Sequence, residues 1–220
     1  MPVTGAHPLA PVDERAGGGR PDGRTELVAG VVLLAVSLVA ALIVYRFPGP
    51  NALDRWGFRL FPVARRSSWM TSVTEAGTLP VLVLGSALAA VVVLPRDRWR
   101  ALACLVGPAA ASATVEWIVK PAVDRHLAGA LTFPSGHVTV VASLGTAWVL
   151  AVPHWLRLPT AAVAAVAVTL MAVSVVKLGW HYPSDTFAGA SFGAGIVLTF
   201  DGLLHMSVGP GSTRPSIWHR

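Results

Sequence analysis

The chain has 220 residues, of which 54% are hydrophobic and only 13% are charged, and its formal net charge is +6 at pH 7. Soluble domains carry about 25% charged residues, so this composition excludes an ordinary soluble globular protein. Arginines near membrane boundaries account for the positive charge, and no basic run interleaved with aromatic residues indicates a nucleic-acid partner. Cys104 is the only cysteine, which excludes a disulfide within the chain.

Residues 1–24 are rich in Pro, Gly, Ala and Arg and contain no apolar stretch of the kind found in signal peptides. We predict that they form a disordered cytoplasmic tail. The first membrane span is expected over residues 27–45, and a Pro-Gly-Pro run follows it. Over residues 51–77 arginines alternate with large apolar side chains, a pattern that is typical of an amphipathic segment lying on the membrane surface.

Five more apolar blocks follow. Together with the first they predict an all-α, polytopic membrane protein, a bundle of six transmembrane helices in one domain of residues 25–205. The loop Pro95–Arg100 carries three arginines, so the positive-inside rule places it on the cytoplasmic side of the membrane, which we expect to be a bacterial-type plasma membrane. Both termini, including a short tail of residues 206–220, then lie on the cytoplasmic side. The later spans are expected at residues 78–94, 101–119, 138–152, 160–178 and 185–200.

Two polar stretches interrupt the apolar pattern. The first runs from Lys120 to His137 and the second from Gly179 to Asp185. Ionisable residues at membrane depth are costly, so they indicate a functional site. Although more than forty residues separate the two stretches, both lie at the extracytoplasmic ends of predicted spans. We therefore expect them to form one site on that face.

Residues 134–137 read Pro-Ser-Gly-His and lead into an apolar span. The N-terminus of a helix binds anions through its free N–H groups and its dipole, and the Ser135 hydroxyl adds a donor. Lys120 and Arg125 bring positive charge suited to phosphate oxygens. Glu116 is placed to pair with Lys120 at i, i+4 spacing. Taken singly, Ser135 is equally explained as a helix cap and Lys120 as a snorkelling residue.

His181 and Asp185 are four residues apart. A carboxylate near an imidazole fixes its tautomer and stabilises its cationic form, which makes the other ring nitrogen a good nucleophile. His137 is then free to protonate a leaving group. Together with an anion site, this set predicts phosphoryl transfer through a phosphohistidine.

A zinc site is the alternative use of the histidines, because His126, His137, His181 and Asp185 are numerous enough to form one. Their spacing matches no zinc motif, and the nearby cations would oppose a metal ion. We therefore predict a site without metal or other cofactor.

These motifs resemble those of the type 2 phosphatidic acid phosphatase superfamily of integral membrane lipid phosphatases. The family's middle motif, PSGH, is intact at residues 134–137, and its last motif ends in His-x-x-x-Asp, present as His181 to Asp185. Its first motif begins with a lysine followed by cations, here Lys120 and Arg125. The resemblance covers residues 78–204 and implies a six-helix core and a metal-independent phosphatase.

The resemblance also implies a role for each site residue. His181 would be the nucleophile, Asp185 its partner and His137 the general acid. The residues expected to hold the phosphate are Lys120, Arg125, Ser135 and Gly136.

The chain departs from the family pattern in two places. The Arg-Pro pair that closes the first motif is replaced by Leu127 and Ala128, and an arginine of the last motif is replaced by Val175. Arg125 and Lys177 are the candidates to compensate for the missing arginine.

The predicted function is therefore the hydrolysis of a lipid phosphate or pyrophosphate at the extracytoplasmic face. Phosphatidic acid, phosphatidylglycerophosphate and polyprenyl phosphates are the candidate substrates, and membrane lipids surround the protein. The alternative, motivated by Val175, is a lipid-phosphate binding or transport protein with the same fold and little catalysis. Such a protein needs its cations but has no use for both His137 and His181. The sequence indicates no particular oligomeric state.

Overall fold

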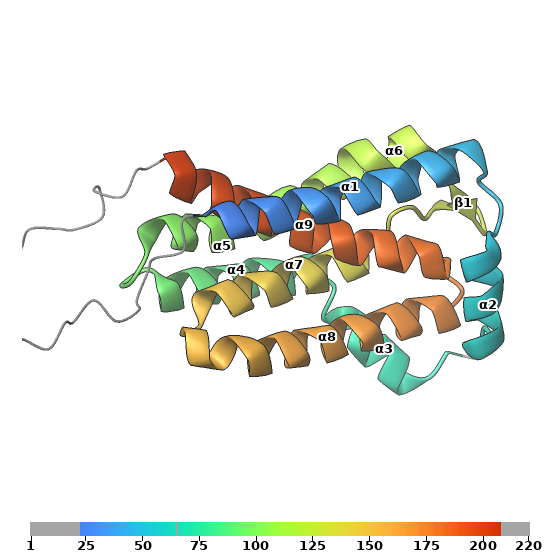
Figure 1. Ribbon diagram of the computed structural model, residues 1–220. Helices are drawn as coiled ribbons and strands as arrows, with labels where there is room; N and C mark the ends of the chain where they lie inside the picture. Colours follow the sequence, from blue (N-terminus) through green and yellow to red (C-terminus); the bar gives the residue numbers. More distant parts are fainter. Residues whose placement is uncertain (1–22, 65, 208–220) are drawn as a thin grey trace, which may run out of the picture.

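The computed structural model describes residues 23–64 and 66–207 (Figure 1). Most of the predicted tails, residues 1–24 and 206–220, therefore lies outside the described residues. The regular secondary structure of the described residues is helical apart from one short hairpin. Its elements are α1 (Arg24–Arg46), α2 (Ala52–Leu60), α3 (Ser68–Glu75), α4 (Leu79–Val93), α5 (Arg98–Thr114), the π-helical turn η1 (Val115–Val119), α6 (Lys120–Val123), β1 (His126–Leu127), β2 (Ala130–Leu131), α7 (Gly136–Ala151), α8 (His154–Lys177) and α9 (Pro183–Ser207).

The long helices lie side by side and alternate in direction along the chain (Figure 1). The α4–α5 and α7–α8 loops share one end of the bundle with the two described chain ends. α2, α6 and the antiparallel β1–β2 hairpin lie at the other end. Both polar stretches singled out in the sequence therefore reach the same end of the molecule.

Four helices are long and apolar enough to cross a membrane: α1, α8, α9 and the continuous helix Arg98–Val123 that α5, η1 and α6 form. α3 and α4 add a fifth span if this pair, bent by 49°, crosses as one. α7 is apolar but has only 16 residues. The prediction of an all-α polytopic membrane protein is confirmed, whereas the count of six spans is reached only with the bent pair and the short α7 included.

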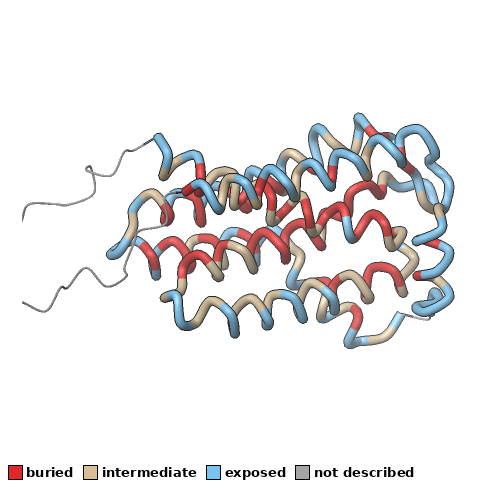
Figure 2. The backbone as a smooth tube through the Cα atoms, in the orientation of Figure 1, coloured by how far each residue is buried: buried red, intermediate tan, exposed pale blue. Residues whose placement is uncertain are grey.

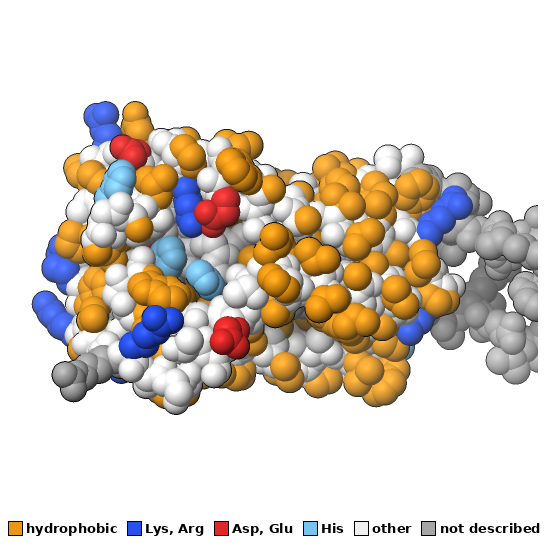
Figure 3. Space-filling model, turned by 180° about the vertical axis from the view of Figure 1, so that it is seen from behind, with side chains coloured by type: hydrophobic (Ala, Val, Ile, Leu, Met, Phe, Trp, Pro, Cys, Tyr) orange, Lys and Arg blue, Asp and Glu red, His pale blue; other side chains and the backbone are white. Residues whose placement is uncertain are grey.

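The distribution of apolar residues suits a bilayer. Buried residues concentrate in α7 and α9 at the centre of the bundle (Figure 2). Large apolar side chains cover much of the outer surface (Figure 3), and Leu158 and Val163 are 80% and 70% exposed. Exposed apolar surface of this extent is not tolerated in water but is solvated by lipid tails.

α9 packs closely against α7 and α1 because glycines line both contacts. A Cβ atom on Gly193 of α9 would lie only 2.5 Å from the carbonyl oxygen of Thr139 in α7. A Cβ atom on Gly30 of α1 would collide with Thr199 of α9. Small residues allow transmembrane helix backbones to approach each other and gain van der Waals contact. The α7–α9 contact holds the two main motifs of the site together.

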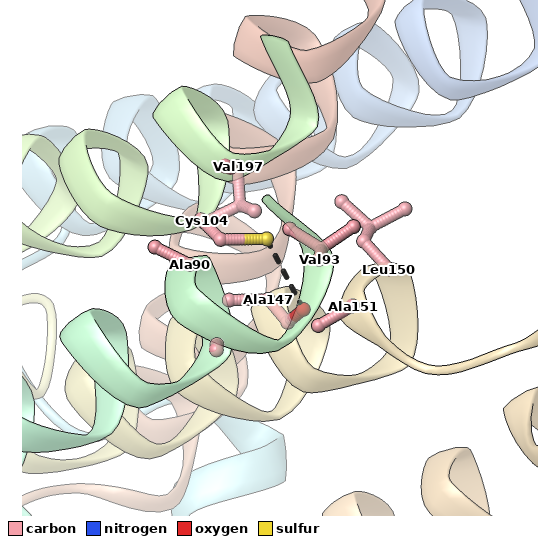
Figure 4. Close-up of a cluster of buried hydrophobic side chains, with 9 residues drawn as sticks. Ala90, Val93, Cys104, Ala147, Leu150, Ala151 and Val197 are labelled. Atoms are coloured by element: carbon pink, nitrogen blue, oxygen red, sulfur yellow. Dashed lines mark hydrogen bonds between the residues drawn. The ribbon is translucent and has the colours of Figure 1, made fainter. Parts of the chain in front are cut away.

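A buried apolar cluster joins α4, α5, α7 and α9 (Figure 4). The Cys104 thiol lies inside it and donates a hydrogen bond to the carbonyl oxygen of Ala147 at 3.3 Å. Cys104 therefore acts as a small buried side chain. The cluster consists of Ala89, Ala90, Val93, Ala101, Cys104, Ala147, Leu150, Ala151 and Val197.

A buried ion pair, which the sequence pattern does not reveal, ties the end of the bundle opposite the polar stretches. The guanidinium of Arg100 donates to both carboxylate oxygens of Asp201 at 3.1 and 3.0 Å. Glu26 of α1 accepts from the same guanidinium at 3.4 Å, and His205 lies 2.8 Å from Asp97. These contacts join α1, α5 and α9.

Several element boundaries differ from the sequence-based expectation. α8 begins at His154 although a turn is expected at residues 153–159, because Pro159 in the second turn removes one hydrogen bond without ending the helix. α9 continues to Ser207 rather than ending near residue 200, since polar residues in its last turns find partners inside the bundle. Residues 51–77 contain two helices, and the second is joined to α4 by the 49° bend.

Substituting Gly193 by alanine should destabilise the bundle, because the added methyl group has no room against the backbone of α7. We expect the free energy of unfolding to fall by about 1–3 kcal/mol, the usual cost of overpacking. Thermal unfolding in detergent measures the effect. Gly49→Ala is the matched control, since its Cβ atom would meet nothing within 4 Å; equal stability of the two variants would contradict the tight α7–α9 contact.

Asp201→Leu should cost about 3–5 kcal/mol of stability, because it leaves the buried Arg100 guanidinium without its main partner. The double variant Arg100→Met/Asp201→Leu should recover most of this loss, since neither charge then remains unpaired. The two variants are compared by unfolding in mixed micelles. A double variant as unstable as Asp201→Leu would show that packing around these side chains, not their charges, holds this end together.

Candidate active site

Four segments meet at the end of the bundle away from the described chain ends. They are the end of the Arg98–Val123 helix, the turn before α7, the α8–α9 junction and α2. His137 follows Gly136, which lies against Glu116 and Lys120, and the His137 ring packs on Trp180, the residue before His181. Figure 3 shows two histidine side chains beside a pair of basic and acidic side chains at this end. The tertiary structure thus brings the two histidines and the lysine of the predicted site together.

The imidazole of His181 is held in one orientation. Its Nδ1 lies 2.8 Å from the carbonyl oxygen of Thr132. A carbonyl oxygen only accepts hydrogen bonds, so Nδ1 carries the proton and Nε2 keeps its lone pair. The nearest carboxylate oxygen of Asp185 is 3.8 Å from Nδ1, at ion-pair distance. The direct orienting group is therefore a backbone carbonyl, where the sequence predicts the Asp185 side chain.

The position of Thr132 depends on the β1–β2 hairpin that precedes it. The N–H of Thr132 donates to the carbonyl oxygen of Arg125 at 2.9 Å, and its hydroxyl donates to the same oxygen at 3.3 Å. Arg125 precedes β1 and Thr132 follows β2, so the hairpin closes between them. The sequence offers no signal for this contact, because every residue carries a carbonyl group and only the fold selects one.

Asp185 lies in the first turn of α9 and links the helix to the PSGH turn. One carboxylate oxygen accepts from the N–H of Tyr182 at 2.9 Å, which caps the helix, and Pro183 occupies its first turn as expected. The backbone carbonyl of Asp185 accepts from the N–H of Ser135 at 3.0 Å. The two motifs are therefore connected directly through their backbones.

Arg125 does not lie where a phosphate ligand is expected. Its side chain is fully buried, and all five of its N–H groups are used. No donor remains for a phosphate, so the expectation that Arg125 binds phosphate or replaces the missing arginine does not fit the structure. The acceptors are the carbonyl oxygens of Pro48 (3.1 Å) and Gly49 (3.2 Å), the hydroxyl of Ser184 (2.8 Å) and carboxylate oxygens of Asp54 (2.7 Å) and Asp185.

The start of α7 has the properties of an anion site. The first hydrogen bond of the helix runs from Thr139 to the carbonyl of Ser135 at 3.0 Å, so the N–H groups of Gly136 and His137 have no acceptor within the helix. The Ser135 hydroxyl is buried and has no partner among the described residues. A buried hydroxyl without a partner is costly unless a ligand provides one.

Lys120 forms the predicted i, i+4 pair with Glu116, whose oxygens lie 2.7 and 2.9 Å from the ammonium nitrogen. The Glu116 carboxylate lies so close to Gly136 that a Cβ atom there would overlap it, and that Cβ would be 3.5 Å from the lysine nitrogen. An internal carboxylate thus occupies the mouth of the anion site.

His137 is half-buried on the other side of the site. Its ring packs on Trp180 with 5.7 Å between ring centroids. Gly77 lies at the α3–α4 bend. A Cβ atom at this position would lie only 2.9 Å from His137, so the bend packs directly against this residue. The bend and the tryptophan together limit the orientations that this ring adopts.

The remaining candidates lie outside this arrangement. His126 and Asp124 pair with each other at 3.7 Å on the surface. Val175 is fully buried in an apolar cluster with Val138, so it offers no substitute for an arginine. Lys177 ends α8 and stays the candidate for that role. Within residues 23–64 and 66–207 no three His, Cys, Asp or Glu side chains are grouped as metal ligands.

The sequence gives only weak signals for two further residues. Asp54 is fully buried at the third position of α2, where it forms a capping box with Asn51. That local pattern predicts the helix start but not the contact with Arg125, 71 residues away. Glu116 pairs with Lys120 as the i, i+4 spacing predicts, but its approach to Gly136 depends on how α7 and the Arg98–Val123 helix meet.

Comparison with known proteins agrees with these motifs. The sequence model of the PAP2 superfamily matches residues 81–205. A solved structure, a transmembrane PAP2-type phosphatidylglycerolphosphate phosphatase from Bacillus subtilis, is similar in fold, with a TM-score of 0.62 and 21% identity over 80% of this chain and 95% of that chain. No curated protein matches the sequence. Because the matched residues form more than half of the chain and contain both the PSGH and His-x-x-x-Asp motifs, this protein belongs to the PAP2 superfamily.

Proposed function

We propose that this protein is a membrane lipid phosphatase that acts through a phosphohistidine on His181. The orientation of His181 is the observation that carries the proposal. With Nδ1 donating to Thr132, the Nε2 lone pair is free to attack. Asp185 at 3.8 Å supplies the negative charge that stabilises the ring once it becomes cationic.

The reaction has two steps. Nε2 of His181 attacks phosphorus, and the bond from phosphorus to the leaving oxygen breaks while His137 donates a proton to that oxygen. Water then attacks phosphorus, His137 takes the proton of the water, and the N–P bond breaks. Phosphate leaves, and both histidines return to their starting states.

Three groups are proposed to hold the phosphate: the Lys120 ammonium, the Ser135 hydroxyl and the N–H groups at the start of α7, including that of Gly136. Helix N-termini with nearby cations bind phosphate well. The Ser135 hydroxyl, buried without a partner among the described residues, supports this role. The substrate phosphate would displace the Glu116 carboxylate from Gly136.

A groove of about 660 Å³ between α4 and α5 supports a lipid substrate. Its walls are mainly apolar, and Glu116 and Trp117 lie at one end of it. The groove thus leads from lipid-facing helices to the carboxylate that pairs with Lys120. A substrate could keep its tail in the groove while its headgroup reaches the histidines.

The proposed orientation places this site on the extracytoplasmic face. The loop that carries three arginines lies at the opposite end of the bundle, which favours the cytoplasm for that end. Phosphatidic acid, phosphatidylglycerophosphate and polyprenyl phosphates or pyrophosphates are the substrates to test, since each joins a phosphate to an apolar chain.

A lipid-phosphate binding or transport protein is the second candidate. It is favoured by the scarcity of free cations among the described residues of the site: Val175 stands where an arginine is expected, the Arg125 donors are all used, and Lys120 is paired with Glu116. A weakly cationic pocket would bind a phosphate reversibly without driving its hydrolysis.

Phosphate release separates the two functions. The purified protein, with chelator present, is expected to release phosphate from at least one lipid of the panel above. His181→Ala should reduce release to background because the nucleophile is lost. His137→Ala should slow release by about 10²–10⁴-fold, the usual contribution of general acid–base catalysis.

The control for folding is His154→Ala, which changes an exposed histidine at the opposite end of the bundle. It should release phosphate at the parent rate. If the parent released no phosphate from any lipid while still binding one, the transport or binding function would replace the enzymatic one. Release that stopped on chelation would contradict the metal-independent mechanism.

Glu116→Gln should tighten the binding of inorganic phosphate by about twofold to fivefold. Removing this half-exposed carboxylate frees Lys120 and removes a repulsive charge worth about 1 kcal/mol or less. Inhibition of lipid hydrolysis by phosphate measures the change. Glu75→Gln, an exposed change in α3, is the control. Weaker binding in Glu116→Gln would mean that Glu116 is needed to hold Lys120 in place.

A further inference from the structure

α2 contributes a fully buried carboxylate, Asp54, from outside the residues that match the family. One oxygen of Asp54 accepts from the backbone N–H of Ser184 at 2.8 Å. The other accepts from Arg125 at 2.7 Å and from the N–H of Asn51 at 3.1 Å. A buried charge persists only where it is paired and hydrogen-bonded, and Asp54 meets both conditions.

Arg125 holds Asp54 and Asp185 on the two arms of a single guanidinium. The planar fork fixes the angle between its partners, which an ammonium group cannot do. Both carboxylates and the guanidinium are fully buried. Asp185 is therefore held in place from the side away from His181 by a residue that depends on Asp54.

α2 also covers the turn between His181 and Asp185. A Cβ atom on Gly57 would lie 2.5 Å from the ring of Pro183, so the helix backbone touches that proline. Phe58 packs edge-on against Tyr182 with 5.9 Å between ring centroids. The Arg125 guanidinium lies over the same tyrosine ring at 3.9 Å. The turn is clamped between α2 and Arg125.

The charges in this cluster do not cancel. Two carboxylates and one guanidinium leave one net negative charge next to His181, whose ring becomes positive when Nε2 attacks phosphorus. Without Asp54, Arg125 would neutralise Asp185 completely, and the cationic ring would lose its counter-charge. Fixed charges in a buried site act strongly, because water does not screen them.

We infer that Asp54 is a positioning residue of the reaction, which neutralises Arg125 and fixes Ser184 so that Asp185 keeps its charge and place beside His181. The inference rests on the proposed function of His181 as nucleophile. It also gives α2, expected from sequence only to lie on the membrane surface, a part in the active site. Asp54 acts through Arg125 and Asp185 and does not touch the substrate.

The test is the kinetics of Asp54→Asn in lipid-phosphate hydrolysis. Asparagine keeps the shape of the side chain and an oxygen for the N–H of Ser184 but removes the charge. We expect kcat to fall about tenfold to hundredfold, the scale seen when a residue that supports the directly acting groups is lost. KM should stay within about threefold, because the proposed phosphate ligands do not contact Asp54.

Asp54→Asn changes both the cap of α2 and the charge of a carboxylate, so each of these changes has its own control. Asn51→Ala removes the other half of the capping box and weakens α2 but leaves the Asp54 charge. Asp124→Asn makes the same chemical change at an exposed carboxylate beside Arg125 in sequence. Both should keep kcat near that of the parent. An equal loss of kcat in Asn51→Ala and Asp54→Asn would overturn the inference in favour of a structural role for α2.

Charge compensation gives a sharper readout. In Asp54→Asn/Arg125→Gln, Asp185 again provides one net negative charge, so kcat should rise above that of Asp54→Asn. A purely structural role predicts the reverse, since the double variant loses more contacts. A folded double variant slower than the single variant would overturn the inference. If Asp54→Asn is too unstable to purify, the double variant alone provides the test. We expect its activity to lie within about tenfold of that of the parent. A double variant that folds but is inactive would overturn the inference.

The parent and His181→Ala are assayed in the same experiment. Phosphate release by the parent that Asp54→Asn leaves unchanged would overturn only the role of Asp54. A parent that releases no phosphate would overturn the proposed function itself, and this inference with it.

Discussion

The hydrogen bonds and ion pairs of the buried Arg125 guanidinium are the interactions on which the end of the bundle with the candidate active site depends. Arg125 joins the loop after α1, the helix α2 and the start of α9, and its own backbone holds Thr132. A charged group is costly to bury inside a protein, so every N–H donor of the buried guanidinium must find an acceptor. That requirement forces distant segments into one arrangement.

The apolar half of the fold provides the rigid support for this polar end. Glycines bring α7 and α9 into backbone contact, so the PSGH turn and the His-x-x-x-Asp turn approach closely enough for Ser135 to bond Asp185. Arg100 and Asp201 fasten the same helix, α9, at its other end. Between the two polar ends the helices meet through small and apolar residues, and their outer faces are left for lipid.

The site separates its charges in a way that suits phosphoryl transfer. Lys120 and the start of α7 lie on the side where a phosphate would bind, whereas Asp185 and Asp54 lie behind His181. An anion and a developing cation are thus each faced by the opposite charge. The Glu116 carboxylate lies at Gly136, so under the proposed function a substrate phosphate would take the place of one anion and leave no cation uncompensated.

The sequence alone determined the membrane class, most of the helices, the two motifs and the Lys120–Glu116 pair, because hydrophobic blocks and i, i+4 spacings are local properties. It placed His137 and His181 at one end by counting spans. Only the tertiary structure decided that Thr132 orients His181, that Arg125 is unavailable to phosphate, and that Asp54 pairs with Arg125. These contacts join residues 49 to 77 positions apart, and three of them use backbone carbonyls. A carbonyl is common to all residues and a buried partner is set by packing, so neither leaves a mark in the sequence.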